Sequence, residues 1–408
     1  MKTSMLAFAT DLHDEGLHTV LGNVQERAGI NQLTLAVAYH DARDIFPHNP
    51  VRKVRYLEGG AVFFQPDESR YKGLQLQPHV AHLARANDPL GDLCAAAVER
   101  GMQVNAWAVF LHNDRLGFAD PLCATQNAFG DRYLTDLCPS NPEVRAYACA
   151  LTSDIGRYEI STIFAESLHF HGLTHGYHHE RYFEELGPIG IYLLGVCFCT
   201  HCLAAARRAG VDVETVHRSV RDELERRLVE GENNRDSEEL TRDGLAAVGG
   251  EQLLSYLDTR IDTVASLAAE VSAAAGPGTN IIFLDLSGAE KGFATGNPTG
   301  HAAPTISWEM GIDIATLAEV CDGIEALGYA ADLDRLGFDL DAYHHLLADP
   351  SQLGLMLRPM PPDCRSADNL VAKVALARER GLQRIDFYHY GFCRLRSLDW
   401  IRQALTAG

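Results

Sequence analysis

The sequence predicts an α/β fold, a single (β/α)8 barrel of the TIM type, on three observations. Eight short runs of β-branched, aromatic and other apolar residues alternate with helix-like segments, which is typical of parallel βαβ units. A length of 408 residues with 46% hydrophobic residues is enough for one large core. A glycine closes a helix-like segment just before the next strand at Gly29, Gly101 and Gly381. We therefore expect one domain over residues 1–408.

The eight expected strands share a short, mostly apolar pattern. They cover residues 5–9, 33–39, 104–111, 162–165, 281–284, 323–327, 353–357 and 385–388. Helical patterns follow several of them, at residues 16–28, 90–101, 142–157, 253–275 and 369–381.

Two insertions interrupt the minimal barrel. Residues 44–87, after the second strand, contain a hairpin and a loop, and we expect the hairpin at 54–64 with Gly59-Gly60 at its turn. Residues 167–250, after the fourth strand, are rich in cysteine and histidine. Within them, the strongly charged stretch 218–243 predicts an exposed helix with a solvated face and a mobile tip near 231–234.

Charge and composition exclude several classes of partner. Asp and Glu number 55 against 35 Lys and Arg, a net charge of −20, which argues against nucleic acid. The apolar stretch at the N-terminus is too short for a signal sequence, and no run reaches transmembrane length. The ten cysteines do not indicate a secreted disulfide scaffold. We expect a cytoplasmic protein with a small-molecule substrate and no membrane partner. Assembly into a homo-oligomer is compatible with the sequence.

The active site of such a barrel gathers where the strands end, at their C-terminal side. Polar residues follow every expected strand. In chain order they are Asp11 and His13, His40 and Arg43, His112 and Asn113, Glu166, Ser167 and His169, Asp285 and Ser287, Tyr329, Arg358, and His389 and Tyr390.

Glu166 ends the buried run of the fourth strand, so its carboxyl group would sit at the mouth of an apolar barrel. Desolvation there disfavours the charged form and suits a general acid. The alternative is that Glu166 caps the next helix or pairs with Arg43 or Arg132. Asp285 ends the fifth strand in the same way, and two such carboxyl groups are what hydrolysis of a glycosidic bond requires. Asp285 could equally accept a hydrogen bond from a backbone amide.

The segment 197–202 carries three cysteines in a Cys-x-Cys-x-x-Cys pattern, which predicts three ligands of one tetrahedral ion. Cys138 is the candidate fourth ligand, with Cys123 or His201 as substitutes. A closed set of four ligands indicates a structural zinc site. The alternative is a group of free thiols at the start of a helix.

The loop after the fourth strand holds five histidines, His169, His171, His175, His178 and His179. Imidazole together with carboxylate is a ligand set for zinc or iron. The same histidines could instead hydrogen-bond sugar hydroxyls or lie on the surface with no shared role. Trp107 and Tyr133 are candidates for stacking on a sugar ring, although a tryptophan within a strand also suits the core.

Several of these motifs occur in an order that resembles a known family. They are 129–133 (Phe-Gly-Asp-Arg-Tyr), 137–145 with Cys138-Pro139-Ser140, then Glu166, then the cysteines at 197–202. This order is similar to the catalytic barrel of the family 42 glycoside hydrolases, the zinc-containing β-galactosidases, within the TIM-barrel glycosidase superfamily. The likeness covers roughly residues 129–205.

The resemblance implies that Glu166 is the acid/base residue. It also implies that the zinc ligands are Cys138, Cys197, Cys199 and Cys202. The sequence departs from the family at two catalytic positions, because Ala165 stands where the family has Asn and the seventh strand has no nucleophilic Glu. We also expect no counterpart of the family's later domains. The resemblance therefore implies a distant relative and does not transfer galactosidase activity.

These observations favour a glycoside-hydrolase-like enzyme that cleaves a small glycoside or sugar derivative, with Glu166 and Asp285 as its two carboxyl groups. The residues expected to hold the carbohydrate substrate are Asp11, His40, Arg43, Trp107, His112, Asn113, Arg132, His169, His171, His179, Arg358, His389 and Tyr390. One alternative is a metal-dependent lyase, isomerase or hydrolase that uses His169, His171 or His179 with Glu166. The other is a carbohydrate-binding barrel without catalysis, suggested by the missing carboxylate on the seventh strand.

Overall fold

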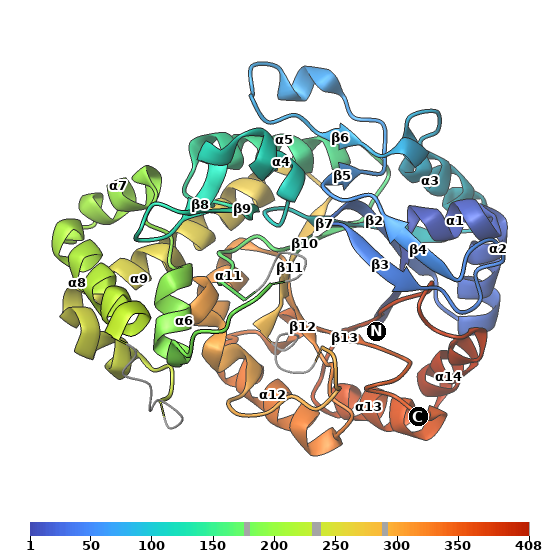
Figure 1. The fold of residues 1–408 in the computed structure, drawn as a ribbon. Helices are drawn as coiled ribbons and strands as arrows, with labels where there is room; N and C mark the ends of the chain where they lie inside the picture. Colours follow the sequence, from blue (N-terminus) through green and yellow to red (C-terminus); the bar gives the residue numbers. More distant parts are fainter. Residues whose placement is uncertain (175–179, 231–237, 288–292, 408) are drawn as a thin grey trace.

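A computed structural model describes residues 1–174, 180–230, 238–287 and 293–407 of the chain, and eight parallel strands close into a barrel within them (Figure 1). The barrel strands are β1 (Lys2–Phe8), β2 (Gln32–Tyr39), β7 (Gln103–Val109), β10 (Thr162–Glu166), β11 (Asn280–Asp285), β12 (Gly323–Leu327), β13 (Leu353–Leu357) and β14 (Arg384–Phe387). The ring closes because β1 pairs with both β2 and β14. The predicted (β/α)8 barrel is confirmed.

Each expected strand overlaps an observed one because the barrel strands are buried on both faces. β12 and β13 have no residue that is even partly exposed, and β2 is buried over its last seven positions. A strand covered on both sides reads as a continuous apolar run rather than as an alternation. These continuous apolar runs are what made the barrel strands predictable from the sequence.

Helices surround the barrel and join its strands (Figure 1). In chain order they include α1 (Ala9–Glu15), α2 (Leu17–Gly22), α3 (Pro89–Glu99), α4 (Asp114–Ala119), α5 (Pro142–Ile155), α6 (Gly187–Gly195), α7 (Thr200–Arg208), α8 (Val213–Glu225), α9 (Arg242–Ala274), α11 (Ile314–Val320), α12 (Leu333–Leu346), α13 (Ala367–Glu379) and α14 (Leu395–Thr406). α9 starts 11 residues before the expected helix and is interrupted at Gly250, whose φ is 62°.

The hairpin expected at 54–64 is wrong. The observed hairpin joins β3 (Ala42–Ile45) to β4 (Val54–Leu57), while β5 (Ala61–Val62) pairs with the end of β2 and with β6 (His79–Val80). Gly59 and Gly60 connect β4 to β5 at a close approach of the backbone, because a Cβ on Gly59 would lie 2.5 Å from the Cβ of Asp41. Gly59 is therefore explained by the close approach of the backbone to Asp41, and the two glycines do not form the turn of a hairpin between β4 and β5.

After β10 the chain forms a helical lobe at one side of the barrel, made of α6, α7, α8 and the start of α9 (Figure 1). α8 was expected to be simply exposed, but it buries Val216, Val220 and Leu224 in the apolar core of this lobe. The spacing of four residues places these side chains on one face and leaves the charges on the other. The expected tip at 231–234 lies outside the described residues.

Length and hydropathy exclude a membrane span for any single helix among the described residues. Among the described helices, only α6 and α7 taken together are long and apolar enough to cross a membrane, and these two helices are bent by 98° relative to each other.

Candidate functional site

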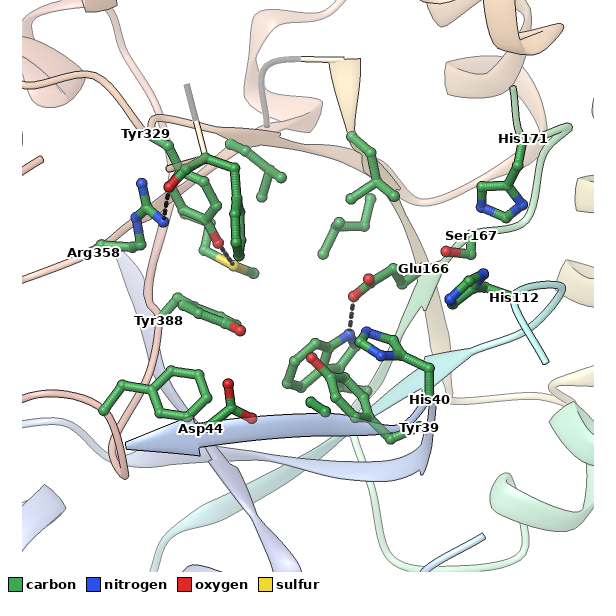
Figure 2. Close-up of a pocket in the computed structure, with 18 of the residues that line it drawn as sticks. Tyr39, His40, Asp44, His112, Glu166, Ser167, His171, Tyr329, Arg358 and Tyr388 are labelled. Carbon is green, nitrogen blue, oxygen red and sulfur yellow. Dashed lines mark hydrogen bonds between the residues drawn. The ribbon is translucent and has the colours of Figure 1, made fainter. Parts of the chain in front are cut away.

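A cavity of about 780 Å³ opens at the C-terminal ends of the barrel strands (Figure 2). Its volume is in the usual range for a small-molecule site. The side chains that matter for chemistry around it are Tyr39, His40, Asp44, Trp107, His112, Glu166, His169, His171, Tyr329, Arg358 and Tyr388. The rest of the wall is largely apolar, including Leu284, Leu286, Leu327, Met356 and Phe392.

Glu166 is the last residue of β10, and its carboxyl group faces into this cavity (Figure 2). Burial raises the pKa of Glu166 to about 7, although the hydrogen bond from Trp107 and the nearby His112 both act to lower it. The indole Nε1–H of Trp107 donates to Glu166 Oε2 at 2.5 Å, which fixes the orientation of the carboxyl group. A carboxyl group with a pKa near 7 is protonated in part of the population at neutral pH, as a general acid requires.

Asp44, which we did not expect at the site, is a second carboxyl group in the same cavity (Figure 2). Side chains alternate along β3, so Arg43 and Ile45 are exposed while Asp44 turns inward. Burial raises the pKa of Asp44. Its Oδ2 atom is buried and has no hydrogen-bond partner among the described residues. A buried acceptor without a partner is costly in a folded protein and is suited to binding a polar ligand atom.

Asp285 does not line the cavity, so the pair predicted from the sequence is not assembled. Its neighbours Leu284 and Leu286 do line it, and alternation along the strand turns Asp285 to the opposite face. There its carboxylate accepts hydrogen bonds from the hydroxyls of Ser287 and of Tyr343 on α12, and its side chain is fully buried. Asp285 therefore connects the barrel to α12.

Aromatic side chains form much of the cavity wall. The ring centroid of Trp107 lies 4.7 Å from that of Tyr39 and 5.8 Å from that of Tyr388, both edge-to-face. On the far side, the Arg358 guanidinium lies 4.1 Å from the centre of the Tyr329 ring. Arg358 is also bound to both carboxylate oxygens of Asp363, at 2.5 Å each, so its charge is already balanced. These flat apolar faces suit the C–H surfaces of a sugar ring.

The structure brings together about half of the residues that the sequence suggested for substrate binding. Those that line the cavity are His40, Trp107, His112, His169, His171 and Arg358. Those that do not are Asp11, Arg43, Asn113, Arg132, His389 and Tyr390. His179 lies outside the described residues, as do His175 and His178.

Each residue outside the cavity is engaged elsewhere or exposed. The Asn113 side chain caps α4 by accepting the Leu116 N–H at 3.0 Å. Arg132 donates to the carbonyl oxygens of Pro121 and Ala124. These are structural roles that residue type and strand position do not reveal.

The remaining polar residues, near the ends of β1 and β14, are buried and do not line the cavity. Asp11 accepts the backbone N–H of Phe8 at 2.9 Å, and burial raises its pKa to about 7. The His389 ring packs 4.0 Å from the Phe8 ring, and burial lowers the pKa of His389 well below its usual value. The hydroxyl of Tyr390 contacts Glu15 instead.

Four cysteines form a buried cluster beside the barrel, at the end of β9 (Arg132–Leu137) and the start of α7. The Cys138 Sγ lies 3.5 Å from the Sγ atoms of Cys199 and Cys202 and 3.9 Å from that of Cys197. Zinc–sulfur bonds of 2.3 Å in a tetrahedron place the sulfurs about 3.8 Å apart, so the spacing fits a metal ion. This cluster could hold a metal, and neither Cys123 nor His201 belongs to it.

Comparison with known proteins gives structural neighbours only. No protein-family model matches the sequence, and no curated protein is similar to it. The structure is similar to α-L-fucosidase isoenzyme 2 from Paenibacillus thiaminolyticus, with a TM-score of 0.55 and 14% identity over 99% of this chain and 48% of that one. It is also similar to β-galactosidase from the psychrophilic Marinomonas ef1, with a TM-score of 0.56 and 10% identity over 100% of this chain and 59% of that one.

A third neighbour is the catalytic domain of β-amylase from Paenibacillus polymyxa, with a TM-score of 0.55 and 12% identity over 100% of this chain and 98% of that one. All three are glycoside hydrolases, and at these identities the likeness shows the fold. The chain spans about half the length of the fucosidase and 59% of that of the galactosidase. Membership of family 42 does not follow from these neighbours.

Proposed function

We propose that this protein is a glycoside hydrolase that cleaves a glycosidic bond of a small glycoside, with Glu166 as general acid and Asp44 as the second carboxyl group. The observation that carries the proposal is the Glu166 carboxyl group, held by Trp107 in a sugar-sized cavity at the barrel mouth with a pKa of about 7. Hydrolysis of this bond needs a protonated group to donate to the leaving oxygen.

Asp44 supports the proposal because it places a second carboxyl group in the cavity, which Asp285 does not line. Figure 2 shows Glu166 and Asp44 on different sides of one open space, with Tyr388 also directed into it. In this arrangement a sugar ring would rest against the aromatic wall, with its leaving oxygen toward Glu166. Asp44, as its carboxylate, would activate a water molecule or attack the anomeric carbon.

The cysteine cluster enters the proposal as a structural zinc site. Four sulfur donors in a closed, buried set suit Zn²⁺ and leave no position for substrate. The ion would hold β9 against α7, and thus the helical lobe against the barrel.

A panel of aryl glycosides and short oligosaccharides tests the proposal, with release of the aryl group or of new reducing ends as the readout. The wild-type protein is expected to hydrolyse at least one member. The Asp44→Asn variant is expected to lose about 10²-fold or more in kcat on that substrate, because the amide can neither attack nor accept the proton of water. Arg43→Gln is the matched control, since Arg43 lies beside Asp44 on β3 and is exposed.

Binding of a glycoside without product, in both the wild type and the variants, would instead support a non-catalytic carbohydrate-binding barrel. Equal turnover by Asp44→Asn and wild type would remove Asp44 from the mechanism and leave Glu166 to be tested separately.

The rate is expected to depend on pH through Glu166. Because the acid must be protonated, kcat/KM should fall as pH rises through about 7. Trp107→Phe removes the N–H donor that stabilises the ionised carboxylate, so the basic limb should move to higher pH. The readout is the pH profile of kcat/KM for both proteins. An unchanged basic limb in Trp107→Phe would mean that another group controls it.

A further inference from the structure

We propose that His112, Asp136 and His171 form a second metal site, for a divalent transition-metal ion, in the wall of the cavity. The Nδ1 atom of His112 lies 3.2 Å and that of His171 lies 3.3 Å from the same oxygen, Asp136 Oδ1. The three ligand atoms lie within 4.8 Å of one another, and all three residues are buried. This site is separate from the cysteine cluster and does not depend on the proposed glycosidase activity.

The two nitrogen–oxygen distances match those between neighbouring ligands of a metal ion. Nitrogen and oxygen ligands at 2.0–2.1 Å from a tetrahedral ion are about 3.3 Å apart. Two imidazoles with one carboxylate are a donor set for Zn²⁺ or Fe²⁺, and both ions accept it with positions left open. Three protein ligands, in contrast to the four of the cysteine cluster, are the pattern of sites that bind a water molecule or a substrate atom.

The backbone holds the three ligands in place from three different segments. His112 follows β7, Asp136 lies on β9, and His171 follows β10. Backbone hydrogen bonds hold β9 against the segment after β7 on both sides of Asp136. The Asn113 N–H donates to the Thr135 carbonyl oxygen and the Leu137 N–H donates to the Leu111 carbonyl oxygen, both at 2.8 Å. Rigid placement of this kind is what an open metal site needs.

The surroundings of Asp136 also suit a ligand. The Thr135 hydroxyl donates to Asp136 Oδ2 at 3.0 Å, which orients the carboxylate and leaves Oδ1 directed at the two imidazoles. Metal-ligating carboxylates are commonly held by such an outer hydrogen bond. Cys138, only two residues further along, belongs to the cysteine cluster, so the end of β9 would contribute to both metal sites.

The site faces the cavity that contains Glu166. Figure 2 shows His112 and His171 on the same side of the cavity as Glu166, and both histidines line it. The open positions on the ion would therefore bind oxygen atoms of the ligand, such as those of two sugar hydroxyls or of the carboxylate of an acidic sugar. The net charge of −20 does not oppose this, since the ion itself would supply the positive charge.

Cobalt titration of the full-length protein tests the site directly. After removal of metal under reducing conditions, Co²⁺ is expected to bind in two equivalents. One equivalent should show the strong charge-transfer absorption of thiolate ligands, and the other only the weak visible bands of nitrogen and oxygen ligands. The variant with His112→Gln and His171→Gln should lose the second equivalent alone. His40→Gln, a histidine of the same cavity whose ring lies 5.2 Å from that of His112, should retain both.

A single equivalent with only the thiolate spectrum in the wild type would overturn the proposal. So would a second equivalent that survives in the double variant. If the double variant does not fold, as judged by its far-UV spectrum, Asp136→Asn takes its place with the same expected loss. None of these readouts uses turnover, so failure of the metal site and failure of the glycosidase assignment are distinguished.

Discussion

Replacing Glu166 with Gln is expected to lower kcat on any true glycoside substrate by about 10²- to 10⁴-fold, the usual contribution of a general acid. Gln preserves the size of the side chain and its hydrogen bond from Trp107, but it has no proton to give to the leaving oxygen. The measurement is kcat and KM on a substrate found in the glycoside panel. KM should change little, because the acid acts mainly in the transition state.

The Glu166→Gln variant should also fold at least as stably as the wild type. The raised pKa means that the cavity disfavours the ionised carboxylate, so folding loses stability as pH rises from the unfolded pKa toward about 7. The neutral amide avoids that loss. A drop in activity with an equal or higher melting temperature at pH 8 would therefore identify a chemical role rather than misfolding.

Asp285→Asn is the matched control on the neighbouring strand. Asp285 points away from the cavity and is bound to Ser287 and Tyr343, so the change should lower the melting temperature and leave kcat within a few fold. A large loss of kcat in Asp285→Asn together with normal turnover in Glu166→Gln would contradict the proposed assignment of the two carboxyl groups.

The barrel could be predicted because its strands are apolar at nearly every position and end in polar residues. The same property limits prediction of the site. A strand buried on both faces gives no alternation in the sequence, so the direction of its last side chain is not readable. Glu166 and Asp285 look equivalent in the sequence, yet only Glu166 lines the cavity.

Asp44 was missed for a different reason. Its inward direction depends on the pairing of β3 with β4, and the glycines at 59 and 60 suggested a different hairpin. With the register known, the exposure of Arg43 and Ile45 assigns Asp44 to the other face. The group of His112, Asp136 and His171 could not be predicted from the sequence either, because its members are far apart along the chain. Of the histidine-rich loop, His171 is the only member in that group among the described residues.

On the proposal that the cysteine cluster holds a structural metal, loss of that metal is expected to destabilise the protein by more than about 4 kcal/mol, the scale associated with loss of a structural metal. Cys199→Ser removes one of four ligands at the N-terminal end of α7, where the cluster joins that helix to β9. The parent protein for this comparison carries His112→Gln and His171→Gln, so that only the cysteine cluster can release metal. Its melting temperature should fall on treatment with a chelator, and that of the same protein with Cys199→Ser added should be low with or without the chelator.

Cys149→Ser is the control for loss of a thiol, because Cys149 is a free cysteine on α5 outside the cluster. It should keep both the stability and the chelator sensitivity of its parent. The effect of the cluster should be concentrated in the helical lobe, whose core includes Val196 and Phe198 on either side of Cys197. Hydrogen exchange should therefore rise first in α7 and α8 and only later in the barrel strands. Uniform exchange across the chain, or stability indifferent to chelator, would mean that the four thiols pack as ordinary core residues.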